Sequence, residues 1–159
     1  KMYVYRFCTN TLVDPLRRRV CVHEYRNIDI SLLERCLALF VGSHDFRAFT
    51  NRFEHTNKKD FGDREGVEYN TTRTVLSIEL RQEDPGYYAI HIHLQSAVYR
   101  MVRNIVSTSL LVAAGGLSLS RLEMLLKEGL SRSHNPAKSA HPQGLTLEHV
   151  FYPEGSPLG

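Results

Sequence analysis

The sequence predicts a single domain of the α+β class. Residues 76–94 alternate between apolar and polar side chains around a central turn, which is typical of a β-hairpin. Three further segments repeat apolar residues at helical spacing. With 159 residues and 42% hydrophobic content, the chain is long enough to bury one sizeable core. We therefore treat residues 1–159 as one domain.

Two strands are expected near the N-terminus. Tyr3-Val-Tyr5-Arg-Phe7 alternates as a strand does, and residues 18–23 continue the alternation after a turn at Asp14-Pro15. These two segments are candidates to pair with each other. The chain opens within a strand-like run and without a signal peptide, so we expect further sequence upstream of Lys1.

A helix and a loop are expected next. Ser31-Leu-Leu-Glu34 has the form of a capping box, which predicts a helix that begins there and stops at Gly42. The apolar residues of this helix are expected to face the core: Leu32, Leu33, Cys36, Leu37 and Phe40. Residues 52–70 are polar and nearly aperiodic, which indicates a mobile surface loop.

The hairpin and the C-terminal elements complete the domain. Asp84-Pro85-Gly86 marks the hairpin turn. The apolar residues that alternate along its two strands are Leu76, Ile78, Leu80, Tyr88, Ile90, Ile92 and Leu94. We therefore expect one face of the hairpin to belong to the core and the other face to be exposed to solvent. A second capping box at Ser120-Arg-Leu-Glu123 predicts a short helix to about Gly129, and residues 145–152 predict a last strand.

Residues 94–111 carry an arginine beside an apolar helical stripe. At about 100° per residue, Arg103 lies at the edge of the stripe, whereas Arg100 points away from it. The stripe consists of Val98, Met101, Val102, Ile105, Val106 and Leu110. An arginine held by such packing can fix a carboxylate or phosphate through two hydrogen bonds. The alternative is an ordinary amphipathic helix whose arginine reaches for solvent.

General catalytic motifs do not decide the function. His91 and His93 share one strand face, but no third ligand at suitable spacing completes a metal site. His44-Asp45 lacks a nucleophile motif such as G-x-S-x-G, which favours a role in stabilising a loop. Gly115-Gly116 lacks the strand, turn and helix context of a nucleotide site.

The composition of the chain limits the partners and the compartment that we expect for it. The net charge of +3 arises from cationic ends around an acidic middle, which is only weakly indicative of a polyanionic partner. Cys8, Cys21 and Cys36 form no C-x-x-C pair, so we expect buried thiols in a reducing intracellular compartment, whether cytoplasm, nucleus or organelle. No apolar run approaches the length of a membrane span, so no membrane partner is expected.

Four segments are spaced along essentially the whole chain: Lys1-Met-Tyr3-Val-Tyr5, Phe40-Val-Gly42-Ser-His44-Asp45-Phe46-Arg-Ala-Phe49, Val98-Tyr-Arg-Met101-Val102-Arg103-Asn104-Ile105-Val106 and Pro142-Gln-Gly144-Leu145-Thr-Leu147. In this order, and with Thr71-Thr-Arg73-Thr74 leading into the hairpin, they resemble the C-terminal half of the TruA-like tRNA pseudouridine synthases. The resemblance implies an antiparallel sheet with helices packed on one face. It also implies isomerisation of uridine in the tRNA anticodon stem-loop without metal or organic cofactor, with tRNA as partner and commonly as a homodimer.

The resemblance assigns three site residues. Tyr3 matches the tyrosine that lies against the target base, a role that suits a base taken out of its stack. Arg103 matches the arginine that pairs with the catalytic aspartate, and Leu145 matches an apolar residue that walls the uracil pocket. Tyr3 and Leu145 also have an ordinary interpretation as core residues. The segment containing His44 and Asp45 matches a loop that we interpret as scaffold near the cleft.

One motif of the resembled family is absent. Its members carry the nucleophilic aspartate in a Gly-Arg-Thr-Asp-Ala-Gly string in their N-terminal half, and no such string occurs among these 159 residues. We therefore expect this chain to be the C-terminal part of a longer enzyme, to lack the nucleophile and to be inactive alone. The alternative is a catalytically silent RNA-binding module.

Overall fold

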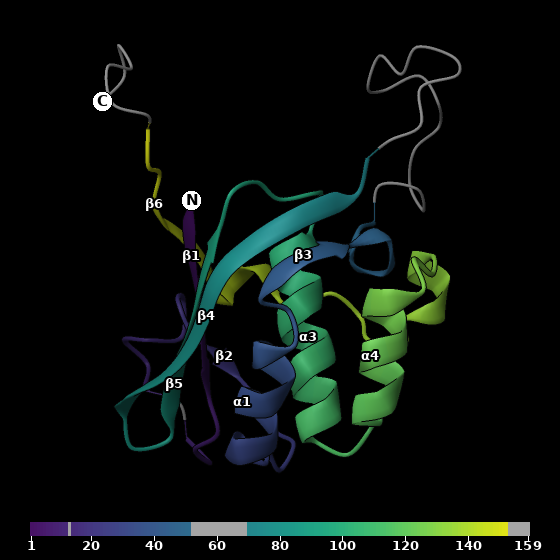
Figure 1. The fold of residues 1–159 in the computed structure, drawn as a ribbon. Coiled ribbons are helices and arrows are strands. Elements are labelled where there is room, and N and C mark those ends of the chain that lie inside the picture. Colours follow the sequence, from purple (N-terminus) through teal and green to yellow (C-terminus); the bar gives the residue numbers. More distant parts are fainter. Residues whose placement is uncertain (13, 52–69, 153–159) are drawn as a thin grey trace.

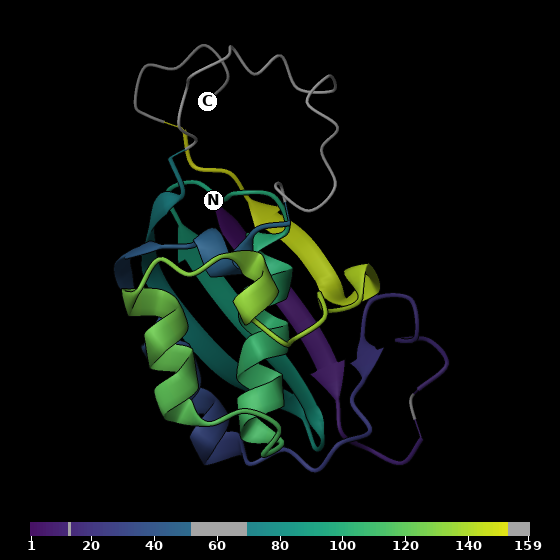
Figure 2. The ribbon, with the colours of Figure 1, turned by 90° about the vertical axis from the view of Figure 1, so that its right-hand side faces the viewer.

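The structure, a computed structural model, describes residues 1–12, 14–51 and 70–152. In these ranges the chain forms a six-stranded sheet, and helices cover one of its faces (Figures 1 and 2). The helices are α1 (Ile30–Ala38), α3 (Met101–Ala113) and α4 (Leu119–Lys127). This arrangement confirms the α+β class. The predicted loop at 52–70 lies, apart from Asn70, outside the described residues.

The sheet is antiparallel except at one edge. Its strands are β1 (Met2–Cys8), β2 (Val22–His23), β3 (Gly42–Asp45), β4 (Thr72–Asp84), β5 (Tyr87–Leu94) and β6 (Leu145–His149). Their order is β2-β1-β5-β4-β3, and β6 also pairs with β1. The second strand expected at residues 18–23 is reduced to β2, which runs parallel to the end of β1. The sheet is therefore mixed, with this one parallel pair beside the antiparallel pairs that the resemblance implies.

The hairpin prediction is confirmed for β5 and needs a correction in β4. Ile90 and Ile92 of β5 are buried in the core, and Ile78 of β4 packs against it. A register shift between Val75 and Ser77 breaks the alternation in β4. Leu76, which falls within this bulge, is 46% exposed and is not the core residue that strict alternation predicts.

The arginine-bearing helix is shorter than residues 94–111. Leu94 is the last residue of β5, and α3 begins only at Met101. Arg100 precedes the helix with φ of 61°, a left-handed conformation that only a few per cent of residues other than glycine adopt. Val98 lies outside the helix but is buried as predicted.

Both predicted capping boxes are displaced by two residues. The side chain of Asp29 caps α1 by accepting a hydrogen bond from the Leu32 amide, with an N–O distance of 2.9 Å. Ser118 caps α4 by accepting from the Arg121 amide at 3.2 Å. Asp and Ser are both strong N-cap residues, so the local chemistry allowed either start.

The core lies between the helices and the sheet. Three phenylalanines, Phe40, Phe46 and Phe49, form an aromatic cluster with ring centroids 5.2 to 6.4 Å apart. The three cysteines are buried free thiols, which confirms the expectation for them. Among the described residues, no helix is long and apolar enough to cross a membrane.

Candidate functional site

Arg103 lies in the first turn of α3 at the border of the core. Its Nε donates a hydrogen bond to the carbonyl oxygen of Ala140 at 2.6 Å, and the Arg103 carbonyl accepts from the Ala140 amide at 3.3 Å. Partial burial and the nearby positive charge of Arg100 lower the pKa of Arg103. No ion pair joins Arg103 to a carboxylate of the described residues. Its four Nη hydrogens therefore remain for an anion that this part of the chain does not supply.

Tyr5 is a site residue that we did not single out from the sequence. It is 1% exposed, and its hydroxyl donates to the carbonyl oxygen of His141 at 3.0 Å. Burial raises the pKa of Tyr5 well above its ordinary value, although the charge of Arg103 opposes the shift. Arg103 and Tyr5 thus hold two consecutive carbonyls of one segment. The alternation Tyr3-Val-Tyr5 could have indicated Tyr5, because residues two apart share a strand face.

Tyr3 and Leu145 lie on either side of Tyr5. Leu145 pairs with Tyr5 across β1 and β6, and Tyr3 is the next residue of β1 on the same face. Both are partly exposed and pack against the core cluster. The structure therefore gathers Tyr3, Arg103 and Leu145 around Tyr5, at the margin of the core and not in its interior.

Gly144 fixes the start of β6 next to Tyr5. A Cβ at this position would lie 2.8 Å from the Arg6 carbonyl oxygen and 2.9 Å from Tyr5 Cζ, closer than real Cβ contacts allow. Only glycine therefore lets Leu145 enter the sheet at this register.

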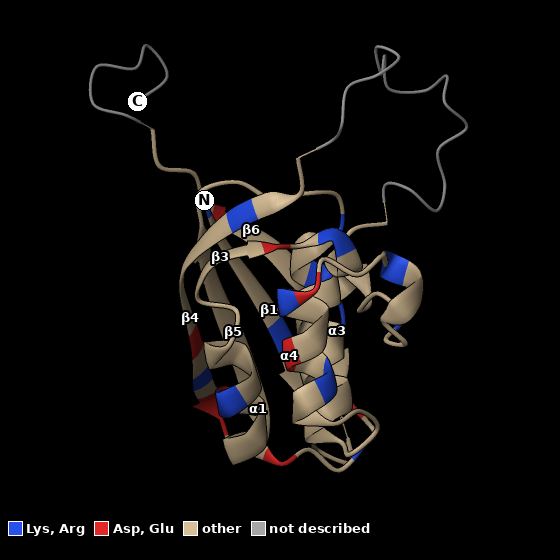
Figure 3. Ribbon diagram, turned by 45° about the vertical axis from the view of Figure 1, so that its right-hand side comes forward, with Lys and Arg blue, Asp and Glu red and all other residues tan. Residues whose placement is uncertain are grey.

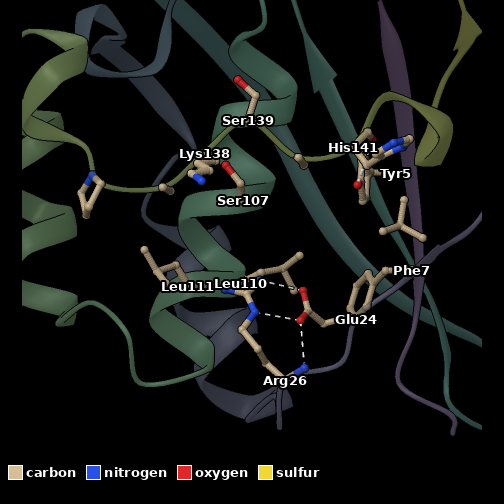
Figure 4. A pocket seen from close by; sticks show the side chains of 14 residues that line it. Tyr5, Phe7, Glu24, Arg26, Ser107, Leu110, Leu111, Lys138, Ser139 and His141 are labelled. Atoms are coloured by element: carbon tan, nitrogen blue, oxygen red, sulfur yellow. Dashed lines mark hydrogen bonds and ion pairs between the residues drawn. The ribbon is translucent and has the colours of Figure 1, made fainter.

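A pocket of about 430 Å³ adjoins the segment held by Arg103 and Tyr5 (Figure 4). Phe7, Leu110 and Leu111 form apolar parts of its wall, and Tyr5 and His141 lie together at another part of it. The remaining residues that line it are Val22, Glu24, Arg26, Ser107, Pro136, Ala137, Lys138, Ser139 and Ala140. The pocket therefore lies directly beside Tyr5 and the two residues whose carbonyls Arg103 and Tyr5 bind.

Glu24 and Arg26 form an ion pair at the pocket wall. The Arg26 Nη2 to Glu24 Oε2 distance is 2.6 Å, and the Glu24 side chain is only 10% exposed. Burial acts to raise the pKa of Glu24, but hydrogen bonds from the Arg26 side chain and backbone outweigh it, so the pKa is lowered. Glu24 is therefore a paired anion in the folded protein.

His44 and Asp45 make their contacts within the fold. The Asp45 carboxylate accepts hydrogen bonds from the Arg47 amide at 2.9 Å and from the Thr71 hydroxyl. His44 Nε2 lies 3.1 Å from the Val41 carbonyl oxygen. These contacts join β3 to the turn that follows it and to the residue that leads into β4.

Several polar side chains on the outer face of the sheet have partners within the fold. Arg6 Nε lies 3.0 Å from Glu83 Oε1, and His91 Nδ1 lies 3.8 Å from Glu148 Oε2. His93 packs on Phe151 at 4.9 Å between ring centroids. Within the described ranges, no group of three or more His, Cys, Asp or Glu side chains is placed to hold a metal ion. Basic and acidic residues are interspersed over strands and helices (Figure 3).

Comparison with known proteins identifies the family. A sequence model of the family described as tRNA pseudouridine synthase matches residues 37–153. The chain is 33% identical over 153 residues to "tRNA pseudouridine synthase A 1" of Desulfotalea psychrophila, covering 96% of this chain and 57% of that protein. It is 30% identical over 153 residues to "tRNA pseudouridine synthase A" of Aquifex aeolicus, covering 95% and 55%. The chain thus spans about half the length of these curated relatives. It belongs to the tRNA pseudouridine synthase family.

Proposed function

We propose that this chain is the C-terminal half of an enzyme that isomerises uridine to pseudouridine in the anticodon stem-loop of tRNA. The observation that carries the proposal is Arg103, a partly buried cation whose Nε is held by Ala140 and which forms no ion pair among the described residues. A guanidinium held in this way is prepared for a carboxylate from another part of the protein.

The proposed carboxylate is a nucleophilic aspartate in the N-terminal half of the complete protein. The Nε of Arg103 is already used by Ala140, so the carboxylate would approach Nη1 and Nη2 together. The positive charge would keep this aspartate ionised, because a nearby opposite charge favours the charged form. An ionised carboxylate is the form that can attack the uridine.

The flipped uracil would lie between Tyr3 and Leu145. Tyr3 offers an aromatic plane and Leu145 an apolar wall on neighbouring strands, and both are accessible at the core margin. Bases taken out of a stack are commonly held between aromatic and apolar side chains. In the overall reaction the bond between ribose C1′ and uracil N1 breaks and a bond between C1′ and C5 forms. The proton on C5 is released and N1 takes up a proton, so the product is an isomer of the substrate and the carboxylate is regenerated. The proposed reaction needs neither a metal nor an organic cofactor.

The proposed partner is tRNA, bound by the complete protein on the helical side of its sheet. On this side Arg100 and Arg103 lie close together, whereas Arg6 and Arg81 on the outer face form ion pairs with glutamates. Arginine without a carboxylate partner is suited to contact phosphate. The proposal includes a homodimer of the complete protein, which light scattering after size-exclusion chromatography tests.

Release of tritium from tRNA that contains 5-tritiated uridine tests the proposed function. The protein encoded by the complete reading frame should release tritium, and the 159-residue chain alone should release none, because the nucleophile is missing. Turnover by the isolated chain would contradict the assignment of the nucleophile to another part of the protein. If the complete protein binds tRNA without turnover, the chain belongs instead to a catalytically silent RNA-binding module.

A further inference from the structure

A chain segment, residues 135–141, crosses α3 and carries the two carbonyls held by Arg103 and Tyr5. Buried polar groups fix its first part. Asn135 is 4% exposed, and its Nδ2 donates to Thr108 Oγ1 at 2.9 Å and to the Ala48 carbonyl at 3.2 Å. The segment is therefore attached to α3 before it reaches Arg103.

Asn104 of α3 binds the second part of the segment. It is fully buried, and its Nδ2 donates to the Phe49 carbonyl at 2.7 Å and to Asn51 Oδ1 at 2.8 Å. Its Oδ1 accepts from the hydroxyl of Ser139 at 2.6 Å. The side-chain amide thus uses both of its donors and its acceptor. A buried amide that is left unpaired costs considerable free energy, so this arrangement permits little variation.

The contact between Asn104 and Ser139 lies one residue away from the contact between Arg103 and Ala140. Along α3 the order is Arg103, Asn104, and along the crossing segment it is Ser139, Ala140. The first contact joins the buried side chain of Asn104 to the partly buried side chain of Ser139, and the second places the Arg103 guanidinium on a backbone carbonyl. Ser139 also lies 3.2 Å from Asn51 Oδ1 through the same hydroxyl, and the Ala140 amide and the His141 carbonyl have partners of their own. The 2.6 Å contact with Asn104 is the shorter of the two contacts of the Ser139 hydroxyl, and it fixes the residue directly before the Ala140 carbonyl.

We infer that Asn104 and Ser139 are positioning residues that orient the Arg103 guanidinium through the Ala140 carbonyl. This inference deepens the proposed function and rests on it. An arginine side chain loses much rotamer freedom when it is fixed, and fixing it before the reaction removes that cost from the catalytic step. Neither Asn104 nor Ser139 touches the reacting atoms in this account.

The alternative is that the same hydrogen bonds only stabilise the fold. The two roles differ in what happens at the Arg103 Nε–H, because a structural role affects global unfolding and does not require a change at this proton. Ser109 offers a matched control. It is fully buried on α3, and its hydroxyl has no hydrogen-bond partner among the described residues. Ser109→Ala removes a buried hydroxyl without touching the crossing segment.

Hydrogen exchange of the Arg103 Nε–H, followed by NMR on the ¹⁵N-labelled 159-residue chain, tests the inference. Ser139→Ala should accelerate this exchange by about fivefold or more, the factor expected for one lost neutral hydrogen bond. Ser139→Thr retains the hydroxyl and should restore exchange to within about twofold of the parent, as should the Ser109→Ala control. If Ser139→Ala does not fold, Ser139→Cys, which keeps the size but donates weakly, takes its place.

Exchange within about twofold of the parent in Ser139→Ala or Ser139→Cys would overturn the inference and leave a structural role. In the complete protein, Ser139→Ala should lower kcat by about fivefold or more, leave KM for tRNA nearly unchanged and be rescued by Ser139→Thr. The exchange measurement needs no activity. A complete protein that does not isomerise uridine would therefore refute the proposed function separately from the positioning role.

Discussion

Replacing Arg103 by lysine in the complete protein separates a fixed guanidinium from a simple positive charge. Arg103 donates through Nε to Ala140 at 2.6 Å, and its Nη atoms remain for a carboxylate. Lysine has one ammonium group and cannot hold the Ala140 carbonyl and both carboxylate oxygens in the same geometry. It would lose at least one charge-assisted hydrogen bond, about 1.5–3 kcal/mol, which corresponds to a loss of about 10- to 150-fold in kcat/KM.

The tritium-release assay measures this loss. We expect Arg103→Lys to be nearly as impaired as Arg103→Ala, and we expect tRNA affinity to change much less in both variants. Arg35→Lys, at an exposed position of α1, is the matched control and should retain the parental rate. If Arg103→Lys turned over at close to the parental rate, the bidentate role would be refuted, and Arg103 would be an ordinary arginine that reaches for solvent.

Three further predictions concern the 159-residue chain itself. Asp29→Ala should lower the free energy of unfolding by about 1 kcal/mol, whereas Ser31→Ala should change it by less than about 0.5 kcal/mol; urea denaturation compares the two. Because the folded-state pKa of Glu24 is lowered, its stabilising effect is present above the unfolded-state pKa and is lost as the pH falls. Glu24→Gln should therefore weaken the dependence of the melting temperature on pH in the acid range, and an unchanged dependence would refute this account. If the 159-residue chain supplies only part of the tRNA-binding surface, it should contact about two to four phosphates. Its binding to tRNA, measured by fluorescence anisotropy, should then be weak, with a slope of log affinity against log salt concentration of about −2 to −3. Tight binding that is insensitive to salt would contradict this expectation.

The apolar stripe of α3 could be predicted from the sequence because it depends only on the spacing of residues that are close together in the chain. Met101, Ile105 and Val106 are buried as their spacing predicts, and Arg103 lies at the edge of the stripe. The start of the helix could not be read with the same accuracy. The apolar residues at Leu94 and Val98 continue the pattern by chance, although the first ends a strand and the second precedes the helix.

The contacts of Arg103 could not be predicted, because they depend on tertiary structure. Ala140 is 37 residues further along the chain than Arg103, and nothing in its type marks it as a hydrogen-bond partner. Ser139 and Asn104 are common polar residues whose pairing becomes visible only once the segment crosses α3. The resemblance to a family predicts Arg103, Tyr3 and Leu145 as site residues, but it carries no information about what holds them.

The first residues of α1 and α4 were predicted incorrectly for a different reason. Ser31 and Glu34 satisfy the capping-box pattern, yet the helix starts two residues earlier because Asp29 offers an equally good acceptor. The same displacement occurs at Ser118. Where two cap residues stand close together, the position at which the apolar face meets the core decides between them, and that position is a tertiary property.

A crystal structure of the complete protein tests the central claim most directly. We predict a carboxylate from outside residues 1–159 at about 3 Å from both Arg103 Nη1 and Nη2, with Nε still bound to the Ala140 carbonyl. Arg103 turned toward solvent, or paired with a carboxylate of this chain such as Asp45, would contradict the claim.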